Sequence, residues 1–468
     1  MVFSSPIFIF AFLPVTLAGY YILHRWRILQ NIWLVIVSLM FYAWGEPKNV
    51  LLMIASIIFN YIFGLLVDKY RDKKSAVRVI LALMVITNIG VLFVYKYLGF
   101  ACSILGIKPS FGTIALPIGI SFYTFQAISY VIDVYKERGE AQKNPLNVAL
   151  YIAFFPQLIA GPIVRYQTIA EEIRNRRETF ADFSYGVERF IVGLTKKIFF
   201  ANSFASIVDF LFQRVPSLSF GSAWIGAICY TLQIYYDFSG YSDMAIGLGR
   251  MFGFKFVENF DYPYISRSVS EFWRRWHISL SSWFRDYVYI PLGGSRVKTK
   301  ARLVFNLFVV WSLTGIWHGA NWTFILWGIG YFVVLTFEKL TELPQRLKKL
   351  PGKIIYQIFT IICVIFGWVI FRADSLQQAK LYMSHMFAVG CKGIDTLALF
   401  LLKDMWLLLI LGVVMATPLM KKLAAHIRDS RYNILYDIVH VVVYMGLFLV
   451  DICYMVNSSY NPFIYFNF

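Results

Sequence analysis

The stretch LVFNLFVVWSLTGIWHGANWTFILWGIGYFVVLT, residues 303–336, decides the fold class of this chain. It is apolar along its length, and a membrane-spanning helix needs about 20 such residues. Its 34 residues are too many for one crossing and too few for two full ones. Gly315, Gly319 and Asn321 lie near its middle and permit a bend. The stretch therefore predicts two helical legs that meet near the WHGAN motif.

His318 is the only histidine or formally charged residue in this stretch. A helix from Arg302 would place it about 24 Å along, near the membrane midplane or towards the outside. An ionisable side chain at that depth costs about 3 kcal/mol on insertion scales, which marks it as a candidate functional residue. One interpretation is a histidine that only hydrogen-bonds between helices. The other, favoured by the adjoining Trp317 and Asn321, is a neutral imidazole that acts as a general base.

The composition of the whole chain is that of a polytopic membrane protein. Of 468 residues, 59% are hydrophobic and 15% are charged, whereas soluble domains carry about 25% charged residues. The net charge of +18 comes from short basic loops, which suit the positive-inside rule and an anionic lipid surface rather than nucleic acid. No long polar stretch is available for a separate soluble domain, so we expect one membrane domain over residues 1–468. The five cysteines have no metal-ligand spacing and predict no metal site.

Apolar runs of spanning length alternate with basic loops along the chain. The runs lie at residues 6–23, 29–45, 48–67, 77–95, 114–135, 186–213, 222–249, 303–336, 354–371, 405–420 and 434–456. The loops predicted to be cytoplasmic are residues 24–27, 68–78, 136–143, 165–177, 250–302, 338–353 and 421–431, and the GEPKN turn at 45–49 is predicted to be external. The expected architecture is all-α, with about 11 to 12 transmembrane helices.

Residues 148–162, VALYIAFFPQLIAGP, do not fit a crossing. The segment is short, it has basic loops on both sides, and Pro156, Gly161 and Pro162 break it. Irregular backbone at membrane depth is tolerated only where protein surrounds it. We therefore predict a re-entrant element buried in protein.

A second constellation lies in residues 250–302, which hold ten Lys or Arg against four Asp or Glu. Within it, aromatic side chains recur at helical spacing through EFWRRWHISLSSWFRDYVYIPLGGSR, residues 271–296. This pattern predicts an amphipathic helix in the cytoplasmic interface, with His277 at the edge of its apolar face in either a structural or a catalytic role. Arg274, Arg275 and Arg296 are candidates for binding donor phosphates or an acidic carrier protein, and an ordinary positive-inside loop is the alternative.

A third cluster is YYDFSGYSD, residues 235–243. Asp237 and Asp243 are near membrane depth, where carboxylates need partners or a wet cavity. They either line a substrate passage or pair with arginines of residues 250–302. Under the first alternative, Tyr241, Trp317 and Asn321 line the same passage.

Several motifs together resemble the membrane-bound O-acyltransferase family. They are FYAWGEP at 41–47, FFPQLIAGPIVRY at 154–166, DFSGYSDMAIGLGRMFGF at 237–254, FWRRWHISLSSWFRDYVYIPLGG at 272–294 and GIWHGANWTFILWG at 315–328. The resemblance is greatest to the alginate O-acetyltransferase subfamily, which includes peptidoglycan O-acetyltransferases, and more distant to D-alanyl transfer proteins. It covers nearly the whole chain, and the two histidine motifs together make it highly specific.

The resemblance implies a fold, an activity and a site. The implied fold is a ring of tilted transmembrane helices with re-entrant elements around a central tunnel. His318 matches the near-invariant family histidine and His277 the second histidine position. The implied reaction moves an acyl group, expected to be acetyl, from a cytoplasmic thioester towards a secreted or cell-envelope polysaccharide such as alginate, peptidoglycan or cellulose. Acetyl-coenzyme A is the expected donor, no bound cofactor is expected, and the expected location is the bacterial plasma membrane.

Under this hypothesis, neutral His318 deprotonates the acceptor hydroxyl, which attacks the thioester carbonyl, and His277 orients the donor or shapes the tunnel. A covalent acyl intermediate on a partner protein is also compatible. In bacterial relatives a separate extracytoplasmic protein often completes the transfer, so we expect a partner of the SGNH transferase type.

Three other functions remain open at this point. Intramembrane His and Asp residues with broken helices also suit a transporter of a polysaccharide or lipid intermediate, although no internal repeat is visible. A non-catalytic scaffold for an envelope complex is a second alternative. Within the enzymes, D-alanyl transfer from a carrier protein is the runner-up.

Overall fold

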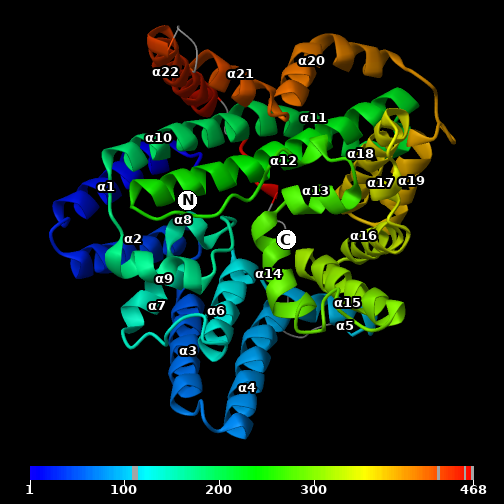
Figure 1. Ribbon diagram of the computed structural model, residues 1–468. Helices are drawn as coiled ribbons and strands as arrows, with labels where there is room; N and C mark the ends of the chain where they lie inside the picture. The colour runs from blue at the N-terminus through cyan, green and yellow to red at the C-terminus, as the bar shows by residue number, and fades with distance from the viewer. Residues whose placement is uncertain (108–113, 429–432, 458–459, 465–468) are drawn as a thin grey trace. The chain divides into compact units, whose positions relative to one another are not determined.

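The computed structural model describes residues 1–107, 114–428, 433–457 and 460–464 (Figure 1). Every regular element among these residues is a helix, which confirms the predicted all-α class. Eight of the described helical segments are long and apolar enough to cross a membrane: Arg27–Gly45, Val50–Lys69, Lys74–Ile104, Phe180–Phe212, Trp322–Thr341, Leu350–Arg372, Thr396–Met415 and Tyr436–Asn457. The chain is therefore a multi-pass membrane protein.

Among the described residues, eight helical segments have the length and apolarity of a crossing, compared with the 11 to 12 expected. The run at residues 114–135 contributes a helix of 16 residues, α6 (Ile120–Tyr135), which is short for a crossing. The run at residues 222–249 lies in a 32-residue helix, α12 (Phe220–Met251), which is diluted by Gly, Ser and Asp and is almost entirely buried. Apolar runs thus coincide with helices, but some of those helices are core elements of the protein.

The described residues form two compact units. The first comprises Met1–Gly193 and Tyr241–Val257, and the second comprises Leu194–Gly240 and Glu258–Phe468. The expectation of one membrane domain stays a prediction.

The first unit contains the N-terminal helices. They are the π-helical turn η1 (Phe8–Phe12), α1 (Leu13–Ile22), α2 (Arg27–Gly45), α3 (Val50–Lys69), α4 (Lys74–Leu92), η2 (Phe93–Tyr97), α5 (Leu98–Ile104), α6, α7 (Pro145–Ala153), α8 (Phe155–Leu158), α9 (Tyr166–Asn175) and most of α10 (Phe180–Thr195). The predicted GEPKN turn is present, since α2 ends at Gly45 and α3 begins at Val50.

The predicted re-entrant segment folds as α7 and α8 with irregular backbone around them. Asn144 begins α7 by accepting a hydrogen bond from Leu146 N at 3.0 Å. Phe154, with φ of −56° and ψ of 113°, separates the two helices. Residues 150–164 are buried without exception, so the prediction that protein surrounds this broken segment is confirmed.

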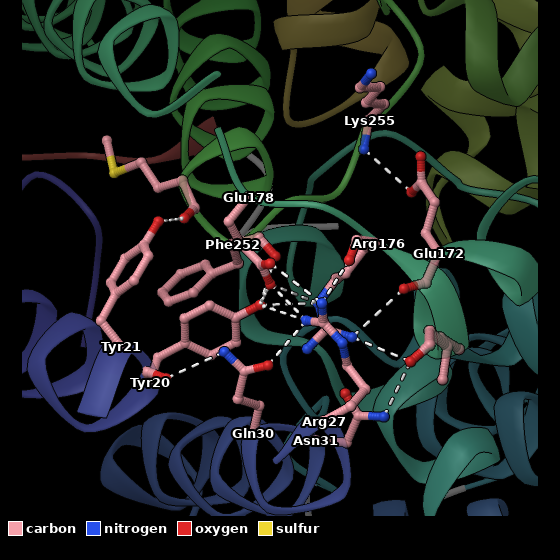
Figure 2. A network of polar contacts seen from close by, with 12 residues as sticks. Tyr20, Tyr21, Arg27, Gln30, Asn31, Glu172, Arg176, Glu178, Phe252 and Lys255 are labelled. Carbon is pink, nitrogen blue, oxygen red and sulfur yellow. Dashed lines mark hydrogen bonds and ion pairs between the residues drawn. The ribbon is translucent and has the colours of Figure 1, made fainter. Parts of the chain in front are cut away.

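A network of polar side chains fastens the ends of several helices in the first unit (Figure 2). Glu178, just before α10, forms an ion pair with Arg27 at the start of α2 and accepts a hydrogen bond from Tyr20 of α1. Arg176 is buried, donates to the Tyr20 hydroxyl at 2.8 Å and lies over the ring of Phe254 at 4.5 Å. Arg27, Arg176 and Phe254 belong to residues 24–27, 165–177 and the start of residues 250–302, so parts of these three predicted loops meet in this network.

The second unit contains the remaining helices. They are η3 (Lys196–Ala201), α11 (Asn202–Phe212), η4 (Val215–Ser217), the first part of α12, η5 (Pro263–Ile265), α13 (Val269–Arg275), α14 (Ile278–Phe284), η6 (Arg285–Tyr289), α15 (Lys300–His318), α16 (Trp322–Thr341), α17 (Leu343–Arg346), α18 (Leu350–Arg372), α19 (Leu376–Met386), α20 (Thr396–Met415), α21 (Leu419–Arg428) and α22 (Asn433–Asn457). α20 begins at Thr396 rather than near 405, because the Asp395 side chain caps it by accepting from Ala398 N at 2.9 Å.

The predicted pair of legs in residues 303–336 is confirmed as the hairpin of α15 and α16 (Figure 1). The two helices approach closely at Gly315 and Gly328. A Cβ atom on Gly315 would lie 2.6 Å from the carbonyl oxygen of Phe324, and one on Gly328 would lie 2.6 Å from that of Trp311. Small residues at such positions let two backbones touch, so a larger side chain at either position would force the legs apart.

Candidate active site

His318 is the last residue of α15, at the bend of the hairpin, and its side chain is only 4% exposed. Three aromatic rings surround the imidazole, with centroids 5.0 Å away for Trp317, 5.0 Å for Trp327 and 5.1 Å for Phe371. Their planes are tilted by 75° to 83° from the imidazole plane, the edge-to-face geometry that aromatic rings prefer. The predicted catalytic histidine is therefore buried among aromatic rings.

Asn321 begins the other leg of the hairpin. Its side-chain oxygen accepts from Thr323 N at 3.1 Å, and its amide nitrogen donates to the Asp374 carbonyl oxygen at 3.0 Å. Both polar atoms of the amide thus have structural roles, as an N-cap and as a tie to the turn after α18. Its assignment to a substrate passage stays a prediction.

His277 lies at a break in the helix, not on a continuous amphipathic surface as predicted. α13 ends at Arg275 and α14 begins at Ile278, and His277 between them has φ of 45° and ψ of 54°. This left-handed conformation costs a non-glycine residue about 1 kcal/mol or more, and such strain is concentrated at functional sites.

The aromatic side chains of this segment also differ from the prediction of an interfacial helix. Trp273, Trp276 and Trp283 are buried inside the protein, and His277 is 1% exposed rather than at an apolar edge. Trp273 packs against Trp311 at 4.9 Å and Tyr331 at 4.9 Å, on the hairpin of α15 and α16. The apolar face that the sequence pattern assigned to lipid is therefore covered by protein.

Asn259 holds the His277 ring and defines its tautomer. The Asn259 side-chain oxygen lies 3.1 Å from Ser279 N, a backbone group that can only donate, so the oxygen and not the amide nitrogen faces this cluster. The same oxygen is 3.2 Å from Nδ1 of His277, which must therefore carry the proton in that hydrogen bond. The Nε2 atom of a neutral ring then keeps its lone pair. Burial lowers the pKa of His277 to about 3, so the ring is neutral near pH 7.

Trp317 connects the two histidine motifs. Its ring centroid is 5.0 Å from that of His318 and 6.2 Å from that of His277. Phe238 of α12 lies on His277 as well, at 4.6 Å and nearly perpendicular. Two histidines that are 41 positions apart in the sequence (318 minus 277) are thus brought to one indole ring.

Asp237 has a partner that the sequence analysis did not anticipate. Lys197 Nζ lies 2.6 Å from one of its carboxylate oxygens, and both side chains are buried. The other oxygen accepts from Ile464 N at 2.8 Å, and Lys197 also donates to the Pro462 carbonyl oxygen. This ion pair therefore neutralises two charges and fastens residues 460–464.

In the first unit, Asp243 forms an ion pair with Arg189 of α10 at 2.6 Å, and Tyr241 stacks on Phe3 at 4.7 Å. The interpretation of Asp237 and Asp243 as paired carboxylates is thus supported. Arg189 and Lys197, the basic residues in these two ion pairs, lie in the segment Phe180–Phe212, whereas the sequence analysis looked for partners in residues 250–302. Arg189 and Lys197 inside that apolar run were the signal in the sequence.

The three candidate arginines differ in their surroundings. Arg274 and Arg296 are exposed. Arg275 is held by Asp261 at 2.7 Å and Glu271 at 3.0 Å. Arg275 therefore has a structural role in this segment, whereas the other two guanidinium groups face outward. Across the part of the chain that the structure describes, no group of three or more His, Cys, Asp or Glu side chains is placed to hold a metal ion.

Comparison with known proteins identifies a family whose matching region contains both histidine motifs. Residues 140–376, which include both histidines and Trp317, match the model of the membrane-bound O-acyltransferase family. The chain belongs to the membrane-bound O-acyltransferase family. It is 39% identical to a probable alginate O-acetylase, AlgI, of Pseudomonas putida over 503 aligned positions that cover 100% of both chains.

Two further relatives define the range of similarity. A peptidoglycan O-acetyltransferase of Helicobacter pylori is 36% identical over 84% of this chain and 81% of its own length. A teichoic acid D-alanyltransferase of Bacillus subtilis is more distant, at 30% identity over 54% of this chain and 68% of its own length. The predicted family and acyltransferase class are confirmed.

Proposed function

We propose that this protein is a membrane O-acetyltransferase that takes an acetyl group from acetyl-coenzyme A in the cytoplasm and delivers it towards a secreted or cell-envelope polysaccharide. The observation that supports this proposal most is the meeting of the His318 and His277 motifs at Trp317 in an acyltransferase family member. The full-length similarity to a probable alginate O-acetylase favours acetyl over D-alanyl transfer.

His318 serves as the general base in the proposed reaction. The neutral imidazole takes the proton of the acceptor hydroxyl while the hydroxyl oxygen forms a bond to the thioester carbonyl carbon. The tetrahedral intermediate then collapses, the C–S bond breaks, and the departing thiolate takes the proton from the His318 imidazolium. The base is regenerated, and the products are the acyl ester and free coenzyme A.

His277 orients the donor. Its Nε2 lone pair accepts a hydrogen bond from a donor N–H, such as the amide groups of the pantetheine arm, because Nδ1–H is committed to Asn259. Arg274 and Arg296 are exposed and suit the phosphates of the same donor. Both proposals place the donor on the side of residues 250–302, which the positive-inside pattern assigns to the cytoplasm.

The acceptor side requires a second protein in this proposal. The polysaccharide lies outside the plasma membrane, so an extracytoplasmic partner of the SGNH transferase type receives the acyl group or presents the acceptor near the WHGAN bend. Alginate, peptidoglycan and cellulose are the candidate polymers, and the inner membrane of a bacterium is the proposed location.

The deciding experiment measures consumption of acetyl-coenzyme A by purified protein in lipid nanodiscs, with and without its partner. The acyltransferase should release coenzyme A slowly alone and faster with the partner and polymer, whereas a transporter or scaffold should release none. A parallel reaction with a D-alanyl carrier thioester as the donor tests the alternative of D-alanyl transfer. Efficient acylation of polymer by this chain alone would overturn the two-component part, and preference for the D-alanyl donor would overturn the acetyl assignment.

A further inference from the structure

We propose that Glu338 is a positioning residue, which locks the segment bearing His277 to the hairpin bearing His318. This inference rests on the proposed function, since it concerns the alignment of the two histidines. Glu338 is near the end of α16, at the opposite end of the hairpin from the WHGAN bend, and is 3% exposed. A buried carboxylate without compensation costs several kcal/mol, so its hydrogen bonds decide what it does.

The Glu338 carboxylate receives four hydrogen bonds. Oε1 accepts from Val269 N at 2.8 Å and from the Tyr356 hydroxyl at 3.0 Å. Oε2 accepts from Ser270 N at 2.8 Å and from the Ser270 hydroxyl at 2.5 Å. Val269 and Ser270 form the first turn of α13, so the carboxylate of one helix binds the free N–H groups that begin another.

The position of α13 sets the position of His277. The helix has seven residues, and His277 follows two positions after its last residue, Arg275. Trp273 on this helix packs against Trp327 at 5.4 Å, and Trp327 in turn lies 5.0 Å from His318. Glu338 therefore fixes one end of α13 and Asn259 fixes the histidine at the other, so that both motifs share one rigid support.

Only a carboxylate suits this place. Each of its two oxygens faces a backbone N–H, and a backbone N–H can only donate. Glutamine has the same shape, but its NH₂ group would face one of those donors at whichever position it took. Glu338→Gln should thus release one edge of the first turn of α13 without changing the volume of the core. Displacement of a catalytic group by about 1 Å can lower a rate by roughly 100-fold.

A double-mutant cycle distinguishes positioning from a merely structural role. In nanodiscs, Glu338→Gln should lower kcat/KM for acetyl-coenzyme A by about 10-fold or more. In a His277→Asn background the same change should lower it by less than about 2-fold, because the residue through which Glu338 acts is already gone. Glu342→Gln, one turn further along and exposed, is the matched control and should leave kcat/KM unchanged.

Each outcome decides the inference. Wild-type kcat/KM in Glu338→Gln, or an equal loss in both backgrounds, would overturn it. If Glu338→Gln does not fold, Ser270→Ala and Tyr356→Phe remove one hydroxyl donor each and should show smaller losses with the same dependence on His277. Losses of these two variants that do not depend on His277 would overturn it equally. A wild-type protein that releases no coenzyme A would instead contradict the proposed function.

Discussion

Around Glu178, in the first unit, two guanidinium groups and a phenol surround one carboxylate, whereas around His318, in the second unit, three aromatic rings surround one imidazole. In the first arrangement, the ionisable groups interact with one another. Glu178 is paired with Arg27 (Figure 2), and Arg176 packs on the rings of Tyr20 and Phe254. Such pairing fixes loop ends, but it leaves no group poised to accept a proton from a substrate.

In the second arrangement, aromatic rings pack around His318, and Asn259 accepts a hydrogen bond from Nδ1 of His277. The comparison gives a hypothesis to test: a buried ionisable residue paired with opposite charges has a structural role, and a buried histidine among aromatic rings is a candidate catalytic base. The following variants test this comparison, in order of decreasing effect.

His318→Ala should show the largest loss of acyl transfer, about 1,000-fold, since general base catalysis contributes about 100- to 10,000-fold. Expression and membrane insertion should be retained, because no charge is stranded. Coenzyme A release is the measurement, and His426→Ala, an exposed histidine of α21, is the control. Wild-type amounts of acylated product in the His318 variant would contradict the catalytic role.

His277→Asn should lower donor use by about 10- to 100-fold, mainly through a higher KM for acetyl-coenzyme A. Asparagine is chosen because it tolerates the left-handed backbone at this position better than alanine. His277→Ala should therefore be less stable than His277→Asn, by about 1 kcal/mol. An unchanged KM in both variants would remove His277 from the donor site.

Glu178→Gln should have the opposite signature, with a lower melting temperature and near-normal kcat at permissive temperature. Losing one member of this partly buried pair should cost about 1 to 3 kcal/mol. Thermal unfolding in detergent at pH 7 measures the cost. A variant with wild-type stability but lost activity would place the network of Figure 2 in the catalytic machinery and break the comparison.

The same pair predicts a pH dependence. Burial alone would raise the pKa of Glu178, but hydrogen bonds from Arg27 and Tyr20 outweigh it and hold the pKa below its usual range near 4.5. A carboxylate with a depressed folded pKa stabilises the protein above its unfolded pKa, and this stability is lost as the pH falls through the folded value. The stability difference between wild type and Glu178→Gln should thus be constant above about pH 5 and shrink below it. A difference that grows on acidification would contradict this sign.

The smallest effect is expected for sidedness probes at exposed positions. In a background without native cysteines, Ser295→Cys should leave activity unchanged and resist an impermeant thiol reagent in intact cells, because residues 250–302 are predicted to be cytoplasmic. Lys48→Cys, in the GEPKN turn, is the matched control and should be labelled from outside. Reaction of Ser295→Cys in intact cells would reverse the proposed donor side.

The sequence by itself determined the class of the protein and the main histidine. Three features depend only on neighbouring residues and can be read without knowledge of the fold. They are the apolar runs, the basic loops and the insertion cost of an isolated His318. The hairpin bend follows for the same reason, since Asn321 caps α16 locally by accepting from Thr323 N, whereas Gly315 lies inside α15 and contacts the other leg. The buried, broken segment at residues 148–162 was likewise predictable from its prolines and its length.

Only the tertiary structure decided the surroundings of His277 and the partners of the buried carboxylates. No Gly or Pro in the sequence marks the break between α13 and α14. The backbone carbonyl oxygen of Asn259 stabilises the break by accepting a hydrogen bond from Ile278 N at 3.0 Å. Lys197 and Asp237 are 40 positions apart, and Glu338 and Val269 are 69 apart. Helix periodicity shows which face of a helix is apolar, but it does not show whether lipid or protein covers that face. It also does not show which distant donor will bind a buried oxygen. Both depend on packing between segments that are far apart in the sequence.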